Sequence, residues 1–136
     1  IGQFVKSMKY NETKIGNIME NITIEQLGRD CFIFRDPDPE DIRVAVEGLE
    51  KLDSILQSTN YDVVILDEVT IALYFKLFSV ETLIEVLSRR NKSIEVIITG
   101  RYAPQELIDI ADLVTEMKEI KHYYEQGVEA RDGIER

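Results

Sequence analysis

The sequence predicts an α/β fold: a doubly wound, mostly parallel sheet in three layers, similar to P-loop NTPases. Residues 63–66 (VVIL) form a continuous apolar run with no polar alternation, and 94–99 (IEVIIT) form a second largely apolar run. Such runs are typical of parallel strands covered on both faces. An amphipathic stretch, 38–56, precedes the first run. Strands that alternate with helices indicate βαβ units and therefore a parallel sheet.

The first part of the chain predicts one strand and an irregular connection. Residues 1–6 (IGQFVK) favour a strand and are followed by a polar stretch. Residues 7–21 are mixed and polar, which predicts a loop that leads to a short helix. A loosely alternating stretch, 22–27, and a short apolar run, 31–34 (CFIF), end at the breaker sequence 35–39 (RDPDP).

The stretch 38–56 predicts the clearest helix. Asp38 is a favourable N-cap, and Pro39 suits the first helical position. Glu40 and Asp41 then lie near the positive end of the helix dipole. Apolar residues follow at steps of three and four and form one stripe, Ile42, Ala45, Leu49, Leu52 and Leu56, widened by Val46 and Ile55. This helix is therefore expected to lie with one face on a sheet.

The second half of the chain predicts further helices and strands in alternation. We expect helices at 69–76 and 79–90, a strand at 94–99, a helix at 104–111 and a last short strand at 113–117. Ser79 is placed to cap the second of these helices, with Glu81 in its first turn. Residues 120–136 are polar and contain two glycines, which predicts a tail that docks on the rest of a single domain.

Composition excludes several classes of protein. The chain has 136 residues, which fits one domain, and its net charge of −10 argues against a general DNA- or RNA-binding face. It has one cysteine, Cys31, and one histidine, His122, so neither an internal disulfide nor a multi-histidine metal site can form. No apolar run is long enough to span a membrane. No signal peptide is visible, which predicts a cytoplasmic location.

Three strand ends are expected to bring polar residues to one edge of the sheet. In open parallel sheets, ligands bind beyond the carboxyl ends of the strands. Those ends are Lys6, Asp67-Glu68 and Thr99-Gly100-Arg101. Four apolar residues followed by two acids have the form of a Walker B strand, whose carboxylate oxygens suit a magnesium ion on nucleotide phosphates. An acid at this position can equally cap the next helix, and Arg101 can equally be a surface residue after a turn.

The phosphate-binding motif G-x-x-x-x-G-K-[ST] is absent, because no Gly is followed by Lys in the sequence. That loop normally follows a first strand and, with its helix, takes about 30 residues before the next strand. We therefore expect residues 1–136 to be one domain that lacks its first strand, phosphate loop and first helix. The nucleotide-binding residues are accordingly not assigned. If no such segment precedes residue 1, the absence counts against nucleotide binding.

Several phrases together resemble the P-loop type of ATP:cob(I)alamin adenosyltransferases. They are VVILDEVT (63–70), VIITGRYAPQELIDIADLVTEMK (96–118) and IKHYYEQGVEARDGIE (120–135), with QFVK (3–6) similar to the family's first strand end. The resemblance covers nearly the whole chain, and the last two blocks are specific because they occur in order and at the family's spacing.

The resemblance implies a reaction and its residues. The family transfers the 5′-deoxyadenosyl group of ATP to a Co(I) corrinoid and releases triphosphate, in the synthesis or salvage of adenosylcobalamin. Asp67 and Glu68 would be the catalytic carboxylates, with Glu68 associated with Mg²⁺. Phe32 and Phe34 match an aromatic motif that packs against the corrinoid, and Arg101 is a further corrinoid-binding candidate. A homodimer is also implied, and a flavoprotein reductase is one candidate partner.

The sequence departs from the family's pattern at several points. Phe34 replaces a Trp, Cys31 and Ser7 each replace a Gly, and Tyr102 replaces the Gly after Ile-Thr-Gly-Arg. Two other functions therefore stay open: a non-catalytic relative that binds nucleotide or corrinoid, and an adaptor domain with no ligand. The 136 residues alone are expected to be inactive, because Glu68 by itself cannot hold a triphosphate.

Overall fold

The computed structural model describes all residues except 9, 30–35, 132–133 and 135–136. Its centre is a four-stranded sheet in the order β2-β1-β3-β4, and every pair of neighbours is parallel. The strands are β1 Gly2–Phe4, β2 Glu25–Leu27, β3 Val63–Asp67 and β4 Glu95–Ile98. The predicted α/β class with a parallel sheet is confirmed.

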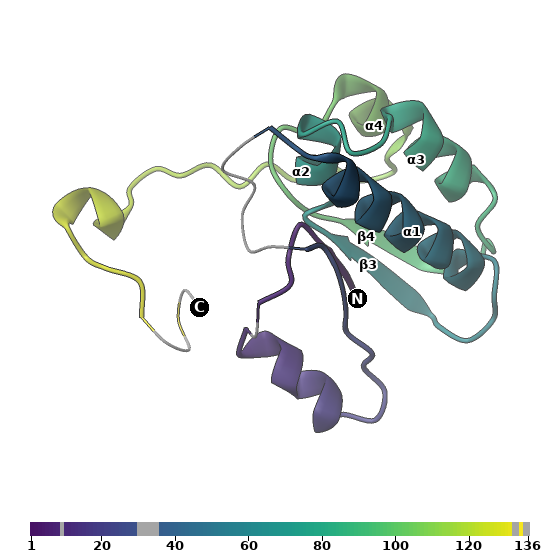
Figure 1. Ribbon diagram of the computed structural model, residues 1–136, viewed down its shortest axis with the longest axis horizontal. Helices are drawn as coiled ribbons and strands as arrows, with labels where there is room; N and C mark the ends of the chain where they lie inside the picture. Colours follow the sequence, from purple (N-terminus) through teal and green to yellow (C-terminus); the bar gives the residue numbers. More distant parts are fainter. Residues whose placement is uncertain (9, 30–35, 132–133, 135–136) are drawn as a thin grey trace.

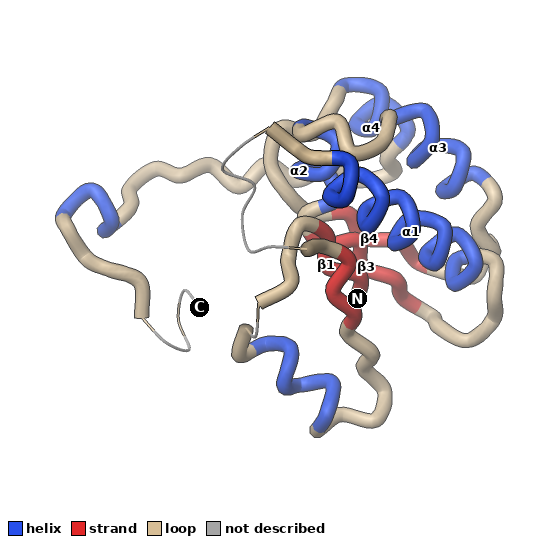
Figure 2. Tube along the Cα trace, viewed as in Figure 1, coloured by secondary structure: helices blue, strands red, loops and turns tan. Residues whose placement is uncertain are grey.

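The helices gather on one side of this sheet (Figure 1). They are the α-helices α1 Pro39–Leu56, α2 Val69–Tyr74, α3 Val80–Ser88 and α4 Gln105–Ile110. The 3₁₀-helices η1 Glu12–Asn17 and η2 Tyr123–Gln126 lie apart from them. Figure 2 shows η1 on the opposite side, where it connects β1 to β2. The connection from β1 to β2 runs across the sheet in one direction, and those from β2 to β3 and from β3 to β4 run in the other. Because connections between parallel strands are right-handed, connections that run in opposite directions lie on opposite faces of the sheet.

Helix α1 begins as predicted. The Asp38 carboxylate accepts hydrogen bonds from the amides of Glu40 and Asp41 at 2.9 and 3.0 Å, and the Asp41 carboxylate accepts one from the amide of Asp38 at 2.9 Å. This reciprocal capping turns Asp41 inward, where it is buried. Ile42, expected in the buried stripe, is 40% exposed. The rest of the stripe at Ala45, Leu49, Leu52 and Leu56 is buried.

The apolar core lies between the helices and one face of the sheet. Its largest fully buried side chains are Phe4, Leu56, Leu66, Val69 and Leu83. The other face is more open, with Val63 and Ile97 47% and 44% exposed. Among the described residues, the expected second helical layer is therefore represented only by η1 (Figure 1). The apolar runs correctly indicate parallel strands, but helices cover them on one face only.

The sequence pattern missed one strand. β2 pairs with β1 in parallel, with Gly2 opposite Glu25 and Phe4 opposite Leu27. Only Leu27 of its three residues is apolar, and it is the only one that is buried. An edge strand with so little buried surface has almost no hydrophobic pattern by which it can be recognised.

The predicted strand at 113–117 is wrong. These residues form no regular structure, and Leu113 and Met117 are 84% and 91% exposed. An apolar sequence makes a strand only where a neighbouring strand accepts its backbone hydrogen bonds, and no described strand lies beside this segment.

Beyond residue 117 the chain runs away from the sheet toward the C-terminus (Figure 1), so the docking of residues 120–136 stays a prediction. Within the described residues, no helix is long and apolar enough to cross a membrane.

Candidate functional site

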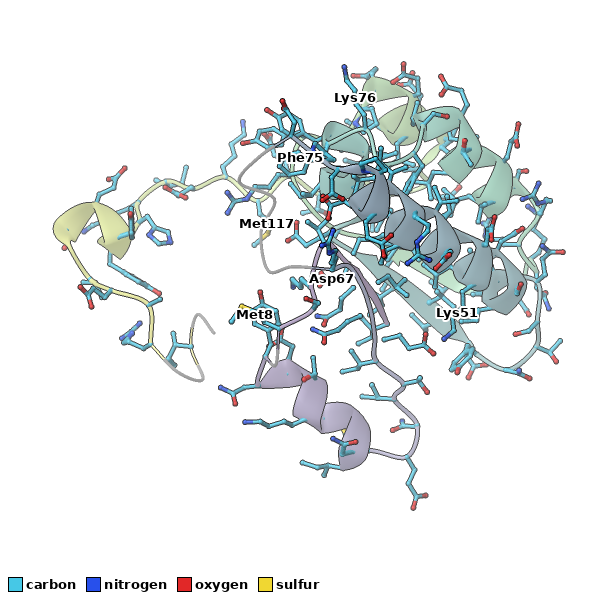
Figure 3. The ribbon with its side chains drawn as sticks, viewed as in Figure 1. Met8, Lys51, Asp67, Phe75, Lys76 and Met117 are labelled. Carbon is cyan, nitrogen blue, oxygen red and sulfur yellow. The ribbon has the colours of Figure 1, made fainter. Side chains whose placement is uncertain are left out.

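The carboxyl ends of β1, β3 and β4 meet at Asp67. Lys6 Nζ lies 2.9 Å from Asp67 Oδ2, and Gln3 Nε2 donates to the same oxygen at 3.3 Å. The Thr99 hydroxyl donates to Asp67 Oδ1 at 2.7 Å. Figure 3 marks Asp67 at this place, which we call the carboxyl edge. The predicted convergence of Lys6, Asp67 and Thr99 is confirmed.

Val5 and Glu68, each directly after a strand that ends at the carboxyl edge, have a left-handed backbone. Val5 follows the last residue of β1 with a φ of 55°, and Glu68 follows the last residue of β3 with a φ of 58°. This region is unfavourable for any side chain with a Cβ and most unusual for a β-branched one. Such conformations persist only where their surroundings hold them, and they concentrate at functional sites.

The two acids of the Asp67-Glu68 pair have different surroundings. Both carboxylate oxygens of Asp67 accept hydrogen bonds, whereas no described residue donates one to the carboxylate of Glu68. The Glu68 amide donates to the Thr99 hydroxyl at 3.2 Å. Asp67 is therefore occupied by the protein itself, and Glu68 presents a half-buried carboxylate that can take a ligand.

The turn after β4 packs directly on the turn after β3. Gly100 has a φ of 136°, and a Cβ added there would lie 2.1 Å from Thr70 Oγ1 and 3.5 Å from the Cα of Glu68. Thr70 is 2% exposed, and its hydroxyl has no described hydrogen-bond partner. Only glycine therefore fits at position 100, and its contact fixes the distance between the two turns.

The ion pair between Lys6 and Asp67 keeps both of these side chains charged. Burial alone would raise the pKa of Asp67, but the hydrogen bonds from Lys6 and Thr99 outweigh it and lower that pKa. Burial would likewise lower the pKa of Lys6, but the contact with Asp67 raises it. Asp67 and Lys6 are therefore both ionised at neutral pH.

The donor set at the carboxyl edge fits a magnesium ion that is shared with phosphates. The described residues contain no group of three or more His, Cys, Asp or Glu side chains that could hold a metal ion by themselves. Mg²⁺ does not need such a group, because it commonly binds one or two carboxylates and completes its shell with phosphate oxygens and water. The carboxylate of Glu68, which accepts no hydrogen bond from the described residues, would offer one hard oxygen ligand of this kind.

Comparison with known proteins identifies the family. The family described as ATP:corrinoid adenosyltransferase BtuR/CobO/CobP matches residues 1–136. The chain belongs to this family. The corrinoid adenosyltransferase of Sinorhizobium sp is 35% identical over 96 residues, which are 70% of this chain and 45% of that protein. Those of Escherichia coli K12 and Salmonella typhimurium LT2 are 33% and 38% identical, over 60% and 54% of this chain.

The chain spans less than half the length of these adenosyltransferases, with 41% of the Escherichia coli protein and 38% of the Salmonella protein covered. Family membership therefore explains why the strand ends of this chain match the adenosyltransferase pattern.

The structure places the remaining site residues predicted from the adenosyltransferase resemblance as follows. Arg101 is exposed directly after Gly100, at the carboxyl edge. The neighbouring Tyr102 has a left-handed φ of 59°, and its ring lies 4.6 Å from that of Tyr74. Phe32 and Phe34, the expected corrinoid contacts, lie outside the described residues, as does Cys31.

The sequence placed Thr99 at the carboxyl edge but did not indicate its hydrogen bonds, and it gave no role to Gln3. Gln3 is 3% exposed and Thr99 joins both acids, but neither residue type indicates chemistry by itself. Position alone located Thr99, because it directly follows β4 beside the end of β3, whereas Gln3 lies inside β1 and carries no such signal.

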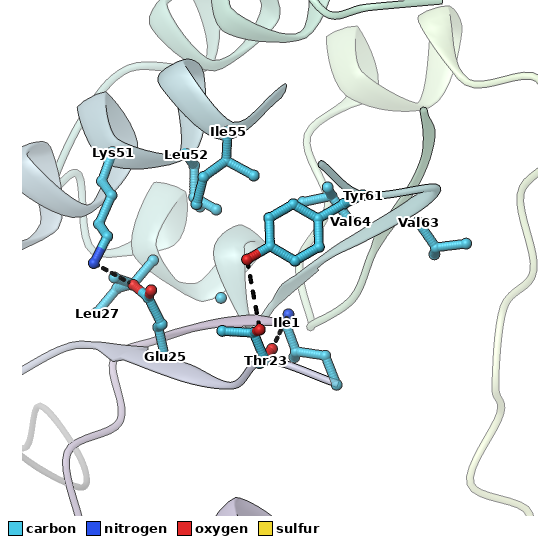
Figure 4. A pocket seen from close by; sticks show the side chains of 11 residues that line it. Ile1, Thr23, Glu25, Leu27, Lys51, Leu52, Ile55, Tyr61, Val63 and Val64 are labelled. Atoms are coloured by element: carbon cyan, nitrogen blue, oxygen red, sulfur yellow. Dashed lines mark hydrogen bonds and ion pairs between the residues drawn. The ribbon is translucent and has the colours of Figure 1, made fainter. Parts of the chain in front are cut away.

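A hollow lies at the end of the sheet opposite to the carboxyl edge (Figure 4). It encloses about 390 Å³, including the part open to solvent, between α1 and the amino ends of β1 and β3. The Tyr61 hydroxyl lies 3.5 Å from Thr23 Oγ1 here, and Lys51 pairs with Glu25 at 2.6 Å. Since ligands of open parallel sheets bind at the carboxyl ends of the strands, the carboxyl edge is the better candidate site.

Proposed function

We propose that the protein containing this chain transfers the 5′-deoxyadenosyl group of ATP to a Co(I) corrinoid. The cobalt electron pair forms a bond to the 5′ carbon, the bond from that carbon to the phosphate oxygen breaks, and triphosphate leaves with the electrons. The observation that supports this is the carboxylate of Glu68 at the carboxyl edge, to which no described residue donates a hydrogen bond, in a chain of the adenosyltransferase family.

The protein contributes position and charge to this reaction, since the nucleophile is the cobalt itself. Glu68 would hold Mg²⁺, which neutralises the charge of the departing triphosphate. Asp67 precedes Glu68 in the chain and accepts hydrogen bonds from Lys6 and Thr99. These bonds hold the strand ends together. The carboxylate of Asp67 therefore acts on the geometry of the site, and that of Glu68 acts on the ligand.

The other parts of the site are proposals from the resemblance. The triphosphate is bound by a phosphate loop contributed from outside the 136 residues. Phe32 and Phe34 pack against the corrinoid, and Arg101 contacts its polar periphery. The active form is a cytoplasmic homodimer, and a flavoprotein reductase supplies the electron that generates Co(I).

The central test uses the full-length protein in which this sequence occurs. It is incubated with ATP, Mg²⁺ and anaerobically reduced cobalamin, and the cobalt–carbon product is followed by absorbance. Glu68→Gln keeps the shape of the side chain and removes its charge, and we expect a rate loss of about 100-fold or more. Glu95→Gln at the opposite end of β4 is the matched control and should leave the rate unchanged.

Two outcomes would contradict the proposal. If Glu68→Gln turns over like the unmodified protein, Glu68 does not hold the metal. If the unmodified protein binds ATP or cobalamin but makes no product, the chain belongs to a non-catalytic relative of the enzymes. The role of Phe34 is tested separately, because Phe34→Ala should slow the reaction from cob(II)alamin plus reductant more than the reaction from cob(I)alamin.

A further inference from the structure

We propose that Thr99 is a positioning residue for Glu68: its hydroxyl bridges Asp67 and the Glu68 amide and fixes the metal-binding carboxylate at the carboxyl edge. This inference deepens the proposed function and rests on it for the identity of the metal ligand. It gives Thr99, which directly follows β4, a role toward the Asp67-Glu68 pair at the end of β3.

The Thr99 hydroxyl is used in both directions. It donates its hydrogen to Asp67 Oδ1 at 2.7 Å and accepts the amide hydrogen of Glu68 at 3.2 Å. A hydroxyl has one hydrogen and two lone pairs, so these two bonds are compatible and also fix its orientation. The amide of Thr99 donates to the carbonyl of Leu66 at 3.1 Å, which fixes the backbone that holds the hydroxyl.

Glu68 needs such a partner because its backbone is strained. A left-handed conformation costs a residue with a side chain about 1–2 kcal/mol. Glu68 also precedes the short helix α2 as its N-cap, yet its side chain makes no capping hydrogen bond. Among the described residues, the bond to Thr99 is the side-chain contact that satisfies the Glu68 amide. Its loss would favour relaxation of the turn.

Gly100 supports the same arrangement from the other side. Its missing side chain lets the β4 turn lie against Thr70 and the Cα of Glu68. The turn therefore cannot move toward β3 to compensate for a lost hydrogen bond, and the Thr99 hydroxyl acts at a fixed distance. Removal of a residue that orients a metal ligand typically weakens metal binding 10- to 100-fold.

The first test measures Mn²⁺ binding by electron paramagnetic resonance, in full-length protein with ATP and without corrinoid. In Thr99→Val the dissociation constant of Mn²⁺ should rise about tenfold. Thr99→Ser keeps the hydroxyl and should restore binding. Thr23→Val is the matched control, because it loses a hydroxyl that contacts Tyr61 at the opposite end of the sheet. A folded Thr99→Val with unchanged Mn²⁺ affinity would overturn the proposal.

A second measurement needs no variant. The Glu68 amide should exchange its hydrogen at least about 100-fold more slowly than in an unfolded chain, since it is bonded to Thr99. Exchange at the unprotected rate would show that the bridge is absent, even if Thr99→Val fails to fold. These results are separable from the proposed function. If the unmodified protein makes no cobalt–carbon product, the proposed reaction is wrong. The protection of the Glu68 amide reports only on its hydrogen bond to Thr99.

Discussion

Lys6 Nζ and Asp67 Oδ2 lie 2.9 Å apart and join two neighbouring strands across 61 positions of sequence. Their side chains are 24% and 23% exposed, so the pair is shielded from much of the solvent. Val5, in its left-handed conformation, immediately precedes Lys6 where the chain leaves β1. The ion pair is therefore part of the fold as well as of the candidate site.

Removal of the Lys6 charge should destabilise the protein. Lys6→Met keeps most of the aliphatic chain but leaves a partly buried oxygen of Asp67 with only the Gln3 hydrogen bond. Hydrogen bonds to charged groups contribute about 1.5–3 kcal/mol, so we expect a loss of that order in the free energy of unfolding, measured with urea.

Lys51→Met is the control for Lys6→Met. Lys51 pairs with Glu25 at 2.6 Å, but its side chain is 57% exposed. Exposed pairs contribute about 0–1 kcal/mol, so this variant should be close to neutral. Equal effects of the two substitutions would show that the Lys6–Asp67 pair behaves as an ordinary surface contact.

The same ion pair predicts how stability depends on pH. The folded pKa of Asp67 is lowered, so its contribution is complete above the unfolded value of about 3.9 and is lost as the pH falls through the folded pKa. The folded pKa of Lys6 is raised, so its contribution is complete below about 10.4 and is lost as the pH rises through the folded pKa. The stability difference between the unmodified protein and Asp67→Asn should therefore be constant between about pH 5 and pH 9.

Urea unfolding at a series of pH values measures this difference. Below pH 4 the two proteins should approach one another in stability, because the unfolded protein binds a proton at Asp67 at a higher pH than the folded protein does. A difference that stays constant down to pH 2 would mean that Asp67 contributes no charge-dependent stability.

The sequence was sufficient where local chemistry determines the structure. Asp38 and Pro39 start α1, Ser79 caps α3, and the apolar runs become β3 and β4. It was insufficient where a distant partner decides. β2 is a strand because β1 lies beside it, and residues 113–117 are not a strand because no described strand does.

The candidate site shows the same division. The order of apolar run and acids located Asp67 and Glu68, and the rule for parallel sheets brought Lys6 and Thr99 to them. The pattern could not distinguish the two acids. Their difference depends on hydrogen bonds from Gln3, Lys6 and Thr99, which become visible only when the strand ends are placed together.

Gly100→Ala should be strongly destabilising. Its φ of 136° is unfavourable for alanine, and the new Cβ would lie 2.1 Å from Thr70 Oγ1. We expect a loss of about 1–3 kcal/mol from backbone strain, with the clash added to it, measured by thermal or urea unfolding. In Thr70→Ala/Gly100→Ala the hydroxyl is gone, so part of the loss should be recovered. If the double variant is as unstable as the sum of the two single ones, the contact with Thr70 does not contribute.

Tyr102 offers a test of strain that is independent of the ion pair. Its φ is 59°, and its ring lies 4.6 Å from that of Tyr74 at a tilt of 31°. Tyr102→Ala loses the ring contact and keeps the strain, whereas Tyr102→Gly loses the contact but relieves about 1–2 kcal/mol of strain. The glycine variant should therefore unfold at a higher urea concentration than the alanine variant.

The ring contact is isolated by combining these variants with Tyr74→Ala. In the unmodified protein, Tyr74→Ala removes a half-exposed aromatic pair, which contributes about 0.5–1.5 kcal/mol. In the Tyr102→Gly background the partner ring is already absent, so Tyr74→Ala should cost less there, and the difference is the coupling energy of the pair. Equal stability of Tyr102→Gly and Tyr102→Ala would mean that residue 102 leaves the left-handed region in solution. The turn after Gly100 would then be able to move, although Gly100 packs against Thr70.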